Sequence, residues 1–390
     1  MEIKYVENPK SNGKVAQVIE ELKKEIISRF HPKSIILTGS FGRGEATVIE
    51  ENGKLKFLSD CEVILIPYKW IFNRKKLDRF EQDFYERTGL KVEIWGFTPT
   101  LYLFLPFLNK KIGPTIANYD LKYGSKVIYG KNYLDKIPAF KPEDIPLWEG
   151  VRLLLNRMAE ALEHFSLNPS ENMLFWTDKI ILACQDSLLL LLNEYTPSYR
   201  ERNERFIKVS KHFNLPCIQT LVEFAKGATH RKLGSNSAIS MDRRLEYWFE
   251  VQKVCDEVLR YILKEGYNIE FRDYIEFQEK YLSSELKNYT TLPFDNVILQ
   301  NLFRFLKGRI MRNKLPTLKM LLKQHRWDHI IYTLIPLIYF ALEKDLGVNT
   351  NYLKKVSEVV FWEKIKADSS FKSWEIAKDV VVSSWCQMRL

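Results

Sequence analysis

Residues 37–45 read LTGSFGRGE and follow the short β-forming run SII at residues 34–36. Glycines at positions 39, 42 and 44 let the backbone approach a ligand closely and leave N–H groups pointing outward, which suits phosphate oxygens. Ser40 adds a hydroxyl group, and the helix that we expect after the turn adds its N-terminal dipole. The stretch therefore predicts a strand-to-helix turn that holds phosphate. A structural turn without a ligand is the alternative.

Two acids follow at the start of a second predicted strand, where residues 59–66 read SDCEVILI. Side chains two positions apart on a strand share a face, so Asp60 and Glu62 should project together. Two neighbouring carboxylates repel each other unless a cation lies between them. Oxygen ligands of this kind suit Mg²⁺, which proteins usually bind through one or two carboxylates together with substrate phosphates. A pair of acids that simply ends a strand at the surface is the alternative.

A third acid, Glu93, lies within the apolar run Val92-Glu93-Ile94 of another predicted strand. A carboxylate on a central strand is costly to bury unless it is paired or bound to a metal ion. The alternative is an outward-facing residue on an edge strand. Taken together, the three fragments supply a phosphate cradle and three carboxylates that could face metal ions, which is most of what phosphoryl-type transfer requires.

In order and in strand–helix context, GSFGRGE, SDCEVILI and VEIWG resemble the DNA polymerase beta-like nucleotidyltransferase superfamily. The acid pair is most similar to that of the aminoglycoside nucleotidyltransferases, in which the second acid is also Glu. The resemblance covers about residues 30 to 130. It departs from the family in spacing, because 20 positions separate Ser40 from Asp60. A hairpin from Glu50 to Lys56, with a tight turn at Asn52-Gly53, would accommodate the extra residues.

The resemblance implies an enzyme that moves a nucleotide from an NTP, with ATP expected, to an acceptor hydroxyl group with release of pyrophosphate. It implies two Mg²⁺ ions, with Mn²⁺ as an alternative. The implied nucleotide-binding residues are Gly39, Ser40, Arg43 and Lys179, and the implied catalytic and metal-binding residues are Asp60, Glu62 and Glu93. Glu93 would hold the catalytic metal and help to activate the acceptor. Lys179 resembles a helical-domain lysine that reaches the triphosphate in relatives, with a solvated surface lysine as the alternative.

The organisation of the chain changes near residue 150. Residues 1–140 alternate helical and strand patterns and predict an α/β (α+β) nucleotidyltransferase-type domain with a mixed sheet. Prolines 138, 142 and 146 give residues 132–148 the composition of a linker. Helical periodicity dominates beyond it and predicts a mostly α-helical C-terminal region. We expect a helical domain at 150–288 that closes over the nucleotide, and a C-terminal helical domain at 289–390 that could bind the acceptor.

Charge points to an anionic partner. The net charge is +10 and the isoelectric point is about 9.1, which fits NTP, RNA, DNA or anionic lipid. Residues 304–326 contain eight Lys and Arg side chains and no acid, with Phe303, Phe305 and Trp327 among or beside them. This composition makes RNA a candidate acceptor. The commoner arrangement, a solvated helical face with its aromatic side chains in the core, is the alternative.

The remaining features predict a soluble cytoplasmic protein that does not enter the membrane. The five cysteines form no CxxC pair, which fits reduced thiols, and the six histidines have no zinc spacing. The N-terminal MEIKYVENPK lacks the apolar core of a signal peptide, and no apolar run reaches the length of a spanning helix. Two other functions stay open: a catalytically silent nucleotide- or RNA-binding regulator of the same fold, and a helical interaction protein. The pattern predicts neither the acceptor, the base preference nor the oligomeric state.

Overall fold

The structure is a computed structural model that describes residues 3–51, 54–67, 74–95, 113–234, 239–284, 286, 327–360 and 365–389. The chain divides into two compact units. The first comprises Met1–Pro146, Asn193–Lys208 and Lys226–Ala238, and the second comprises Leu147–Leu192, Val209–Ala225 and Ile239–Leu390. The three-domain division given above stays a prediction.

The first unit is built on a mixed four-stranded sheet. Its strands are β1 (Ser34–Leu37), β4 (Cys61–Ile66), β5 (Val92–Trp95) and β6 (Lys126–Gly130), in the order β5-β4-β1-β6. Strand β1 is antiparallel to both β4 and β6, whereas β4 and β5 are parallel. The mixed sheet and three of its strands agree with the sequence prediction. Strand β6 was not predicted, because its apolar run is short and glycines at 124 and 130 bound it.

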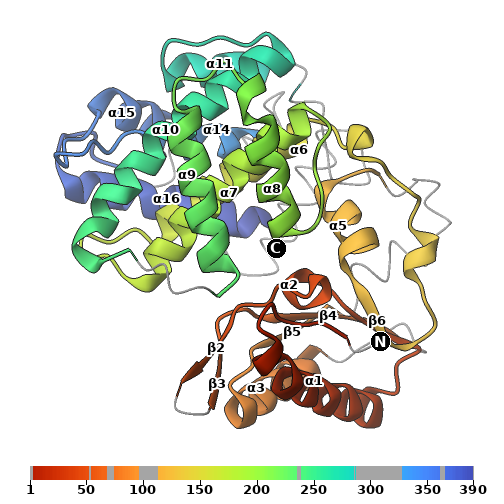
Figure 1. The fold of residues 1–390 in the computed structure, drawn as a ribbon. Coiled ribbons are helices and arrows are strands. Elements are labelled where there is room, and N and C mark those ends of the chain that lie inside the picture. Colours follow the sequence, from red (N-terminus) through yellow and green to blue (C-terminus); the bar gives the residue numbers. More distant parts are fainter. Residues whose placement is uncertain are drawn as a thin grey trace. The chain divides into compact units, whose positions relative to one another are not determined.

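Helices α1 (Pro9–Phe30) and α3 (Arg74–Thr88) cover one face of this sheet (Figure 1). Both are amphipathic, and their apolar stripes join the inward side chains of the strands in one core. The fully or almost fully buried members of that core include Val15, Ile19, Leu22, Ile26, Ile35, Leu37, Cys61, Val63, Leu65, Leu77, Phe80, Phe84, Val92 and Ile94. His31 ends α1 in the left-handed conformation, and Pro32 follows it.

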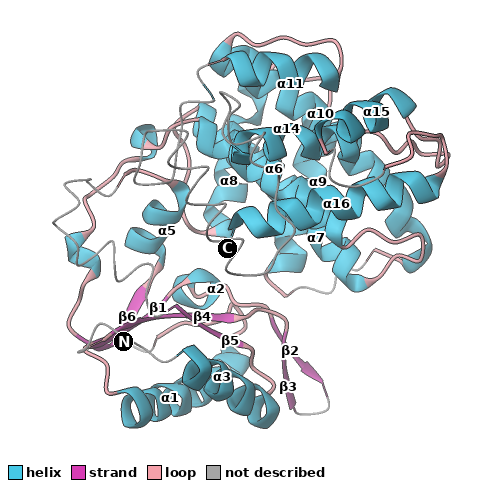
Figure 2. Cartoon of the chain, turned by 180° about the vertical axis from the view of Figure 1, so that it is seen from behind, coloured by secondary structure: helices cyan, strands magenta, loops and turns pink. Residues whose placement is uncertain are grey.

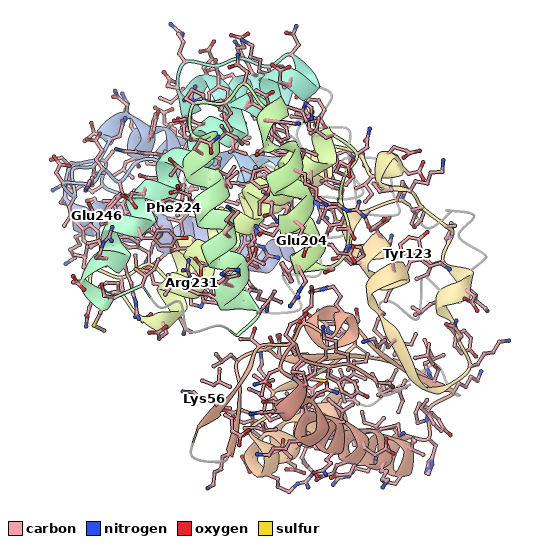
Figure 3. All side chains as sticks on the ribbon, viewed as in Figure 1. Lys56, Tyr123, Glu204, Phe224, Arg231 and Glu246 are labelled. Atoms are coloured by element: carbon pink, nitrogen blue, oxygen red, sulfur yellow. The ribbon has the colours of Figure 1, made fainter. Side chains whose placement is uncertain are left out.

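The predicted hairpin is present as β2 (Val48–Glu51) and β3 (Lys54–Phe57), a separate antiparallel pair in which Val48 is opposite Phe57 (Figure 2). Its Asn52-Gly53 turn lies outside the described residues. Lys56 on β3 is exposed and marks the hairpin in Figure 3. Helix α2 (Gly39–Arg43) opens directly after β1, as the Gly-rich stretch predicted, and α5 (Ile116–Gly124) precedes β6.

Residues 132–148 are more than a linker. They contain two short 3₁₀ turns, at Leu134–Lys136 and Pro142–Asp144. Five of their apolar side chains are buried, namely Tyr133, Leu134, Ile137, Phe140 and Ile145. The prolines give the segment the composition of a linker, and these side chains, spaced among the prolines, bury apolar surface that orders it.

The described part of the second unit is mostly α-helical, as predicted. Its longest helices are α6 (Trp148–Glu163), α7 (Glu171–Leu191), α10 (Arg244–Tyr267), α14 (Trp327–Tyr339) and α16 (Phe371–Arg389), and the shorter ones are α11 (Tyr274–Ser283) and α15 (Thr350–Val359). Helices α8 (Tyr199–Val209) and α9 (Ile218–Lys232) each contribute residues to both units. Within the described ranges, no helix is long and apolar enough to cross a membrane. The basic stretch 304–326 lies outside those ranges.

Candidate functional site

The acid pair lies where β4 begins. Asp60 directly precedes the strand and Glu62 is its second residue, and both side chains are half-buried. The alternate residues Cys61 and Val63 are fully buried in the core with α1 and α3. Because side chains alternate along a strand, Asp60 and Glu62 project on the opposite face. Burial, together with the Asp60 and Glu62 carboxylates, raises the pKa of the Cys61 thiol, so Cys61 stays a neutral core residue.

Glu93 is the register partner of Glu62 across the parallel strands β4 and β5. Neighbouring strands are about 4.8 Å apart, and opposed residues point to the same face. Val92 and Ile94, which flank Glu93, are buried in the core. The three carboxylates predicted from sequence therefore project from one face of the sheet, on two adjacent strands.

The Gly-rich turn lies directly against this face. The Thr38 N–H donates to the carbonyl oxygen of Glu62 at 3.0 Å, which joins the end of β1 to β4. Gly39 has a φ of +62°, and a Cβ atom there would collide with the Glu62 carboxylate. Glycine is therefore required for both the backbone conformation and the close approach of this side chain. Ser40 follows in a buried position.

A lysine occupies the outer part of the site. Lys91 Nζ lies 2.6 Å from a carboxylate oxygen of Glu93. Hydrogen bonding to Glu93 raises the pKa of Lys91, and the nearby Asp60 charge acts in the same direction. Among the described residues, no three His, Cys, Asp or Glu side chains converge closely enough to hold a metal ion. The sheet thus aligns the three acids on one face, while the Glu93 side chain is engaged by Lys91.

A second lysine, Lys232, belongs to the same unit and was not predicted. Its Nζ atom lies 3.4 Å from Ser59 Oγ, next to Asp60 in the chain, and 5.8 Å from the centre of the Tyr199 ring. Burial lowers the pKa of Lys232, as does the Arg43 charge, whereas Tyr199 and the two acids Asp60 and Glu62 oppose that shift. The Lys232 amino group therefore lies close enough to the acid pair to interact with both carboxylates. The available sequence signal was the basic end of α9, His230-Arg231-Lys232, of which Arg231 is labelled in Figure 3.

The base of the hairpin holds Lys232 in place. The Thr47 hydroxyl donates to the carbonyl oxygen of Lys232, and the Thr47 N–H donates to Ser59 Oγ at 2.9 Å. The Ser59 N–H in turn donates to the Thr47 carbonyl oxygen at 3.2 Å. Ser59 and Thr47 are both buried. The hairpin that lengthens the Ser40–Asp60 spacing therefore also anchors a segment far along the chain beside the acids.

Arg43, predicted to bind nucleotide, has protein partners in the structure. Its guanidinium lies 3.5 Å from the Glu45 carboxylate, 3.8 Å from that of Asp120 and 5.0 Å from the centre of the Tyr199 ring. Its side chain is 10% exposed, which leaves little of it for a ligand. Burial raises the pKa of Asp120, while Arg43, Arg202 and a hydrogen bond from Tyr195 act against this shift. These contacts support a structural role for Arg43, and its contact with nucleotide stays a prediction.

Glu45, the last residue of the quoted stretch, caps helix α8. Its buried carboxylate accepts hydrogen bonds from Ser198 Oγ at 2.7 Å, from the Tyr199 N–H at 2.9 Å and from the Arg200 N–H at 3.2 Å. A carboxylate at the first turn of a helix satisfies backbone donors that lack a helical partner. The end of the Gly-rich stretch therefore fixes residues 198–200 within the first unit.

Lys179, the other predicted nucleotide ligand, lies on α7 in the second unit. Its Nζ atom is 4.5 Å from the ring centre of Phe175 and 4.1 Å from that of Trp176, distances typical of cation–π contacts. These contacts give Lys179 a local structural role. Its part in nucleotide binding stays a prediction.

No protein-family model matches this chain, and no curated protein sequence matches it. The residues of the site are therefore the basis for a functional assignment.

Proposed function

We propose that this protein is a metal-dependent nucleotidyltransferase of the DNA polymerase beta-like type, which moves a nucleotide from an NTP to an acceptor hydroxyl group. The observation that carries the proposal is the register of Glu62 with Glu93. It aligns three carboxylates, together with Asp60, on one sheet face beside the turn at Gly39. A phosphate-sized ligand at that turn would lie next to Glu62, whose carboxylate packs against Gly39.

The donor set fits divalent cations. Mg²⁺ and Mn²⁺ prefer oxygen ligands, and carboxylates at a strand end are among their usual partners. Two lysines, Lys91 and Lys232, already lie close to the acids, which supports a preference of this face for positive charge. Asp60, Glu62 and Glu93 would hold the ions once Glu93 leaves Lys91. Bound there, divalent ions would neutralise the triphosphate and lower the pKa of the attacking hydroxyl.

The side chains of the chain have separate roles in this scheme. The acceptor oxygen attacks the α-phosphorus, the bond to the pyrophosphate oxygen breaks, and the acceptor proton must pass to a base. Glu93 is the candidate for orienting the acceptor and taking that proton. Gly39 and Ser40 would bind the triphosphate, and Lys232 supplies a positive charge for the leaving pyrophosphate. Desolvation of Lys232 strengthens its interaction with a phosphate.

A second candidate is a nucleotide-binding regulator of the same fold without transfer activity. The ion pair between Lys91 and Glu93 favours it, because the third carboxylate is already engaged by a lysine and no three acids of the described residues converge closely enough to hold a metal ion. In such a protein Lys91 would replace a metal ion permanently. NTP would then bind without release of pyrophosphate.

Pyrophosphate release separates the two candidates. The full-length protein would be incubated with Mg²⁺, each labelled NTP and fractionated cell extract as a source of acceptor. The enzyme should release pyrophosphate and label one fraction, and EDTA should abolish both. Asp60→Ala and Glu62→Ala should remove the activity while the protein stays folded. Asp83→Ala, at an exposed acid on α3, is the matched control and should keep it.

Normal turnover in either Asp60→Ala or Glu62→Ala would contradict the metal-site assignment. NTP binding without pyrophosphate release in any fraction would favour the regulator.

A further inference from the structure

Strand β5 carries Glu93 and is an edge of the sheet as far as the described strands go. Two side chains of α3 bind its backbone at Ile94. The Ile94 N–H donates to Glu81 Oε1 at 2.8 Å, and Arg74 Nη1 donates to the Ile94 carbonyl oxygen at 2.8 Å. Arg74 Nη2 also donates to the second carboxylate oxygen of Glu81 at 2.9 Å. Arg74 and Glu81 thus form a closed ring of hydrogen bonds with one residue of the strand.

The direction of the Ile94 backbone explains this arrangement. The Cys61 N–H on β4 donates to the Lys91 carbonyl oxygen at 2.8 Å, so the backbone groups of residue 91 face β4. Successive residues of a strand direct these groups to opposite sides. Residues 91 and 93 therefore face β4, whereas Ile94 faces away from it. Arg74 and Glu81 take the positions that a further strand would occupy.

We propose that Arg74 and Glu81 are positioning residues for Glu93: they hold the outer side of β5 so that the Glu93 carboxylate stays beside Glu62. The inference rests on the proposed function, because it assigns this clamp a purpose in metal binding. Glu93 lies next to Ile94 and on a strand of only four residues, Val92–Trp95. With the backbone of β5 bound on one side by β4 and on the other by the clamp, the strand cannot shift in register.

The environment of Glu81 supports this role. Burial raises the pKa of Glu81, and the charges of Asp78 and Glu93 act in the same direction, whereas the Ile94 N–H and Arg74 lower it. Glu81 is thus partly shielded from water, and its hydrogen-bond partners are the Ile94 N–H and Arg74. Groups that do not contact the metal but hold a metal ligand in position typically change metal affinity by about 10- to 100-fold when they are removed.

Mn²⁺ binding to the full-length protein tests the proposal without relying on turnover. The affinity would be measured from the electron paramagnetic resonance signal of free Mn²⁺, in the absence of nucleotide, well below the melting temperature of every variant. Glu81→Ala and Arg74→Ala should each weaken Mn²⁺ binding by about tenfold or more. Glu81→Gln keeps an oxygen that accepts from the Ile94 N–H and should retain most of the affinity. Glu86→Ala, at an exposed acid of α3 hydrogen-bonded to Gln82, is the matched control.

Each outcome is informative. Parental Mn²⁺ affinity in both Glu81→Ala and Arg74→Ala would overturn the positioning role and leave the proposed function intact. An equal loss in Glu81→Gln and Glu81→Ala would also overturn it, because the hydrogen bond to Ile94 would then not be responsible. If the parent protein itself binds no Mn²⁺, the metal site fails, and the proposed function and the inference fall together.

Discussion

The Glu45 carboxylate accepts a hydrogen bond from the backbone N–H of Tyr199, 154 residues further along the chain. The same carboxylate lies 3.5 Å from Arg43. One side chain therefore links the Gly-rich stretch to the first turn of α8. This explains why residues 193–208 belong to the same compact unit as the sheet.

Replacement of Glu45 should destabilise the protein strongly. Glu45→Ala leaves backbone donors of α8 and the buried Arg43 without this partner, and we expect a loss of about 3 kcal/mol in the free energy of unfolding. Glu45→Gln keeps an acceptor and should lose less. The control is Glu50→Ala, which breaks an exposed ion pair with Lys14 and should cost less than about 1 kcal/mol. Urea unfolding would measure all three, and a Glu45→Ala effect as small as that of Glu50→Ala would contradict the cap.

Gly39→Ala should impair the site beyond the cost of its backbone strain. The positive φ should cost about 1–2 kcal/mol for any residue with a Cβ atom, and the new methyl group should also displace the Glu62 carboxylate. Gly89→Ala is a matched control, because Gly89 has a φ of +71° with nothing within 4 Å of the added atom. We expect both variants to lose similar stability, with Mn²⁺ affinity reduced in Gly39→Ala alone. Equal Mn²⁺ affinity in the two variants would show that displacement of the Glu62 carboxylate does not affect metal binding.

Lys232→Met should make the protein more stable and bind NTP more weakly. Burial lowers the pKa of Lys232, so the charged form costs stability in the folded state at neutral pH. As the pH rises from the lowered pKa towards the ordinary value of 10.5, the folded protein releases this proton first and the cost disappears. The excess stability of the variant should therefore shrink across that window. Melting temperatures between neutral pH and pH 10.5 would measure this.

NTP binding to Lys232→Met tests which lysine contacts the triphosphate. Lys226→Met, at an exposed lysine of the same helix, is the control and should bind as the parent does. Lys179→Met should bind normally if Lys232 fills this role. A loss in Lys179→Met with normal binding in Lys232→Met would support the residue implied by the family resemblance.

Glu93→Gln should separate binding from chemistry. Asp60 and Glu62 remain to support metal-dependent NTP binding, while the candidate base is lost, so we expect the transfer rate to fall by roughly a hundredfold or more. Asp60→Asn should reduce both binding and rate. Calorimetric titration with NTP and single-turnover rates would measure the two effects. If Glu93→Gln transfers nucleotide at the parental rate, Glu93 has no catalytic role, and Asp60 and Glu62 alone are the catalytic acids.

Local sequence patterns were sufficient to predict the strands and the turn that carry the site. The i, i+2 spacing placed Asp60 and Glu62 on one face, and the glycines placed a turn before α2. The partners of these elements depend on contacts between distant parts of the chain. The register of Glu62 with Glu93 follows from the order of the strands, which no local pattern encodes. Lys232 reaches Ser59 across 173 residues, and the resemblance directed attention to Lys179 instead.

Arg43 shows a second reason why sequence patterns do not predict the contacts of a side chain. A basic residue inside a Gly-rich stretch suggests phosphate binding. Two acids, one of them 77 positions away at Asp120, and the Tyr199 ring already surround it. Sequence identifies the chemical type of a side chain, but its partner is decided by which segments the fold brings together.

The clamp of Arg74 and Glu81 also has a consequence for association between molecules. An edge strand with open N–H and C=O groups can pair with a strand of another molecule and so promote aggregation. At Ile94 both outward groups are already bound by side chains of α3. Glu81→Ala would free the Ile94 N–H, which only Glu81 binds among these two side chains. Such a variant should form oligomers at concentrations at which the parent does not, because Glu81 no longer blocks pairing at this strand edge.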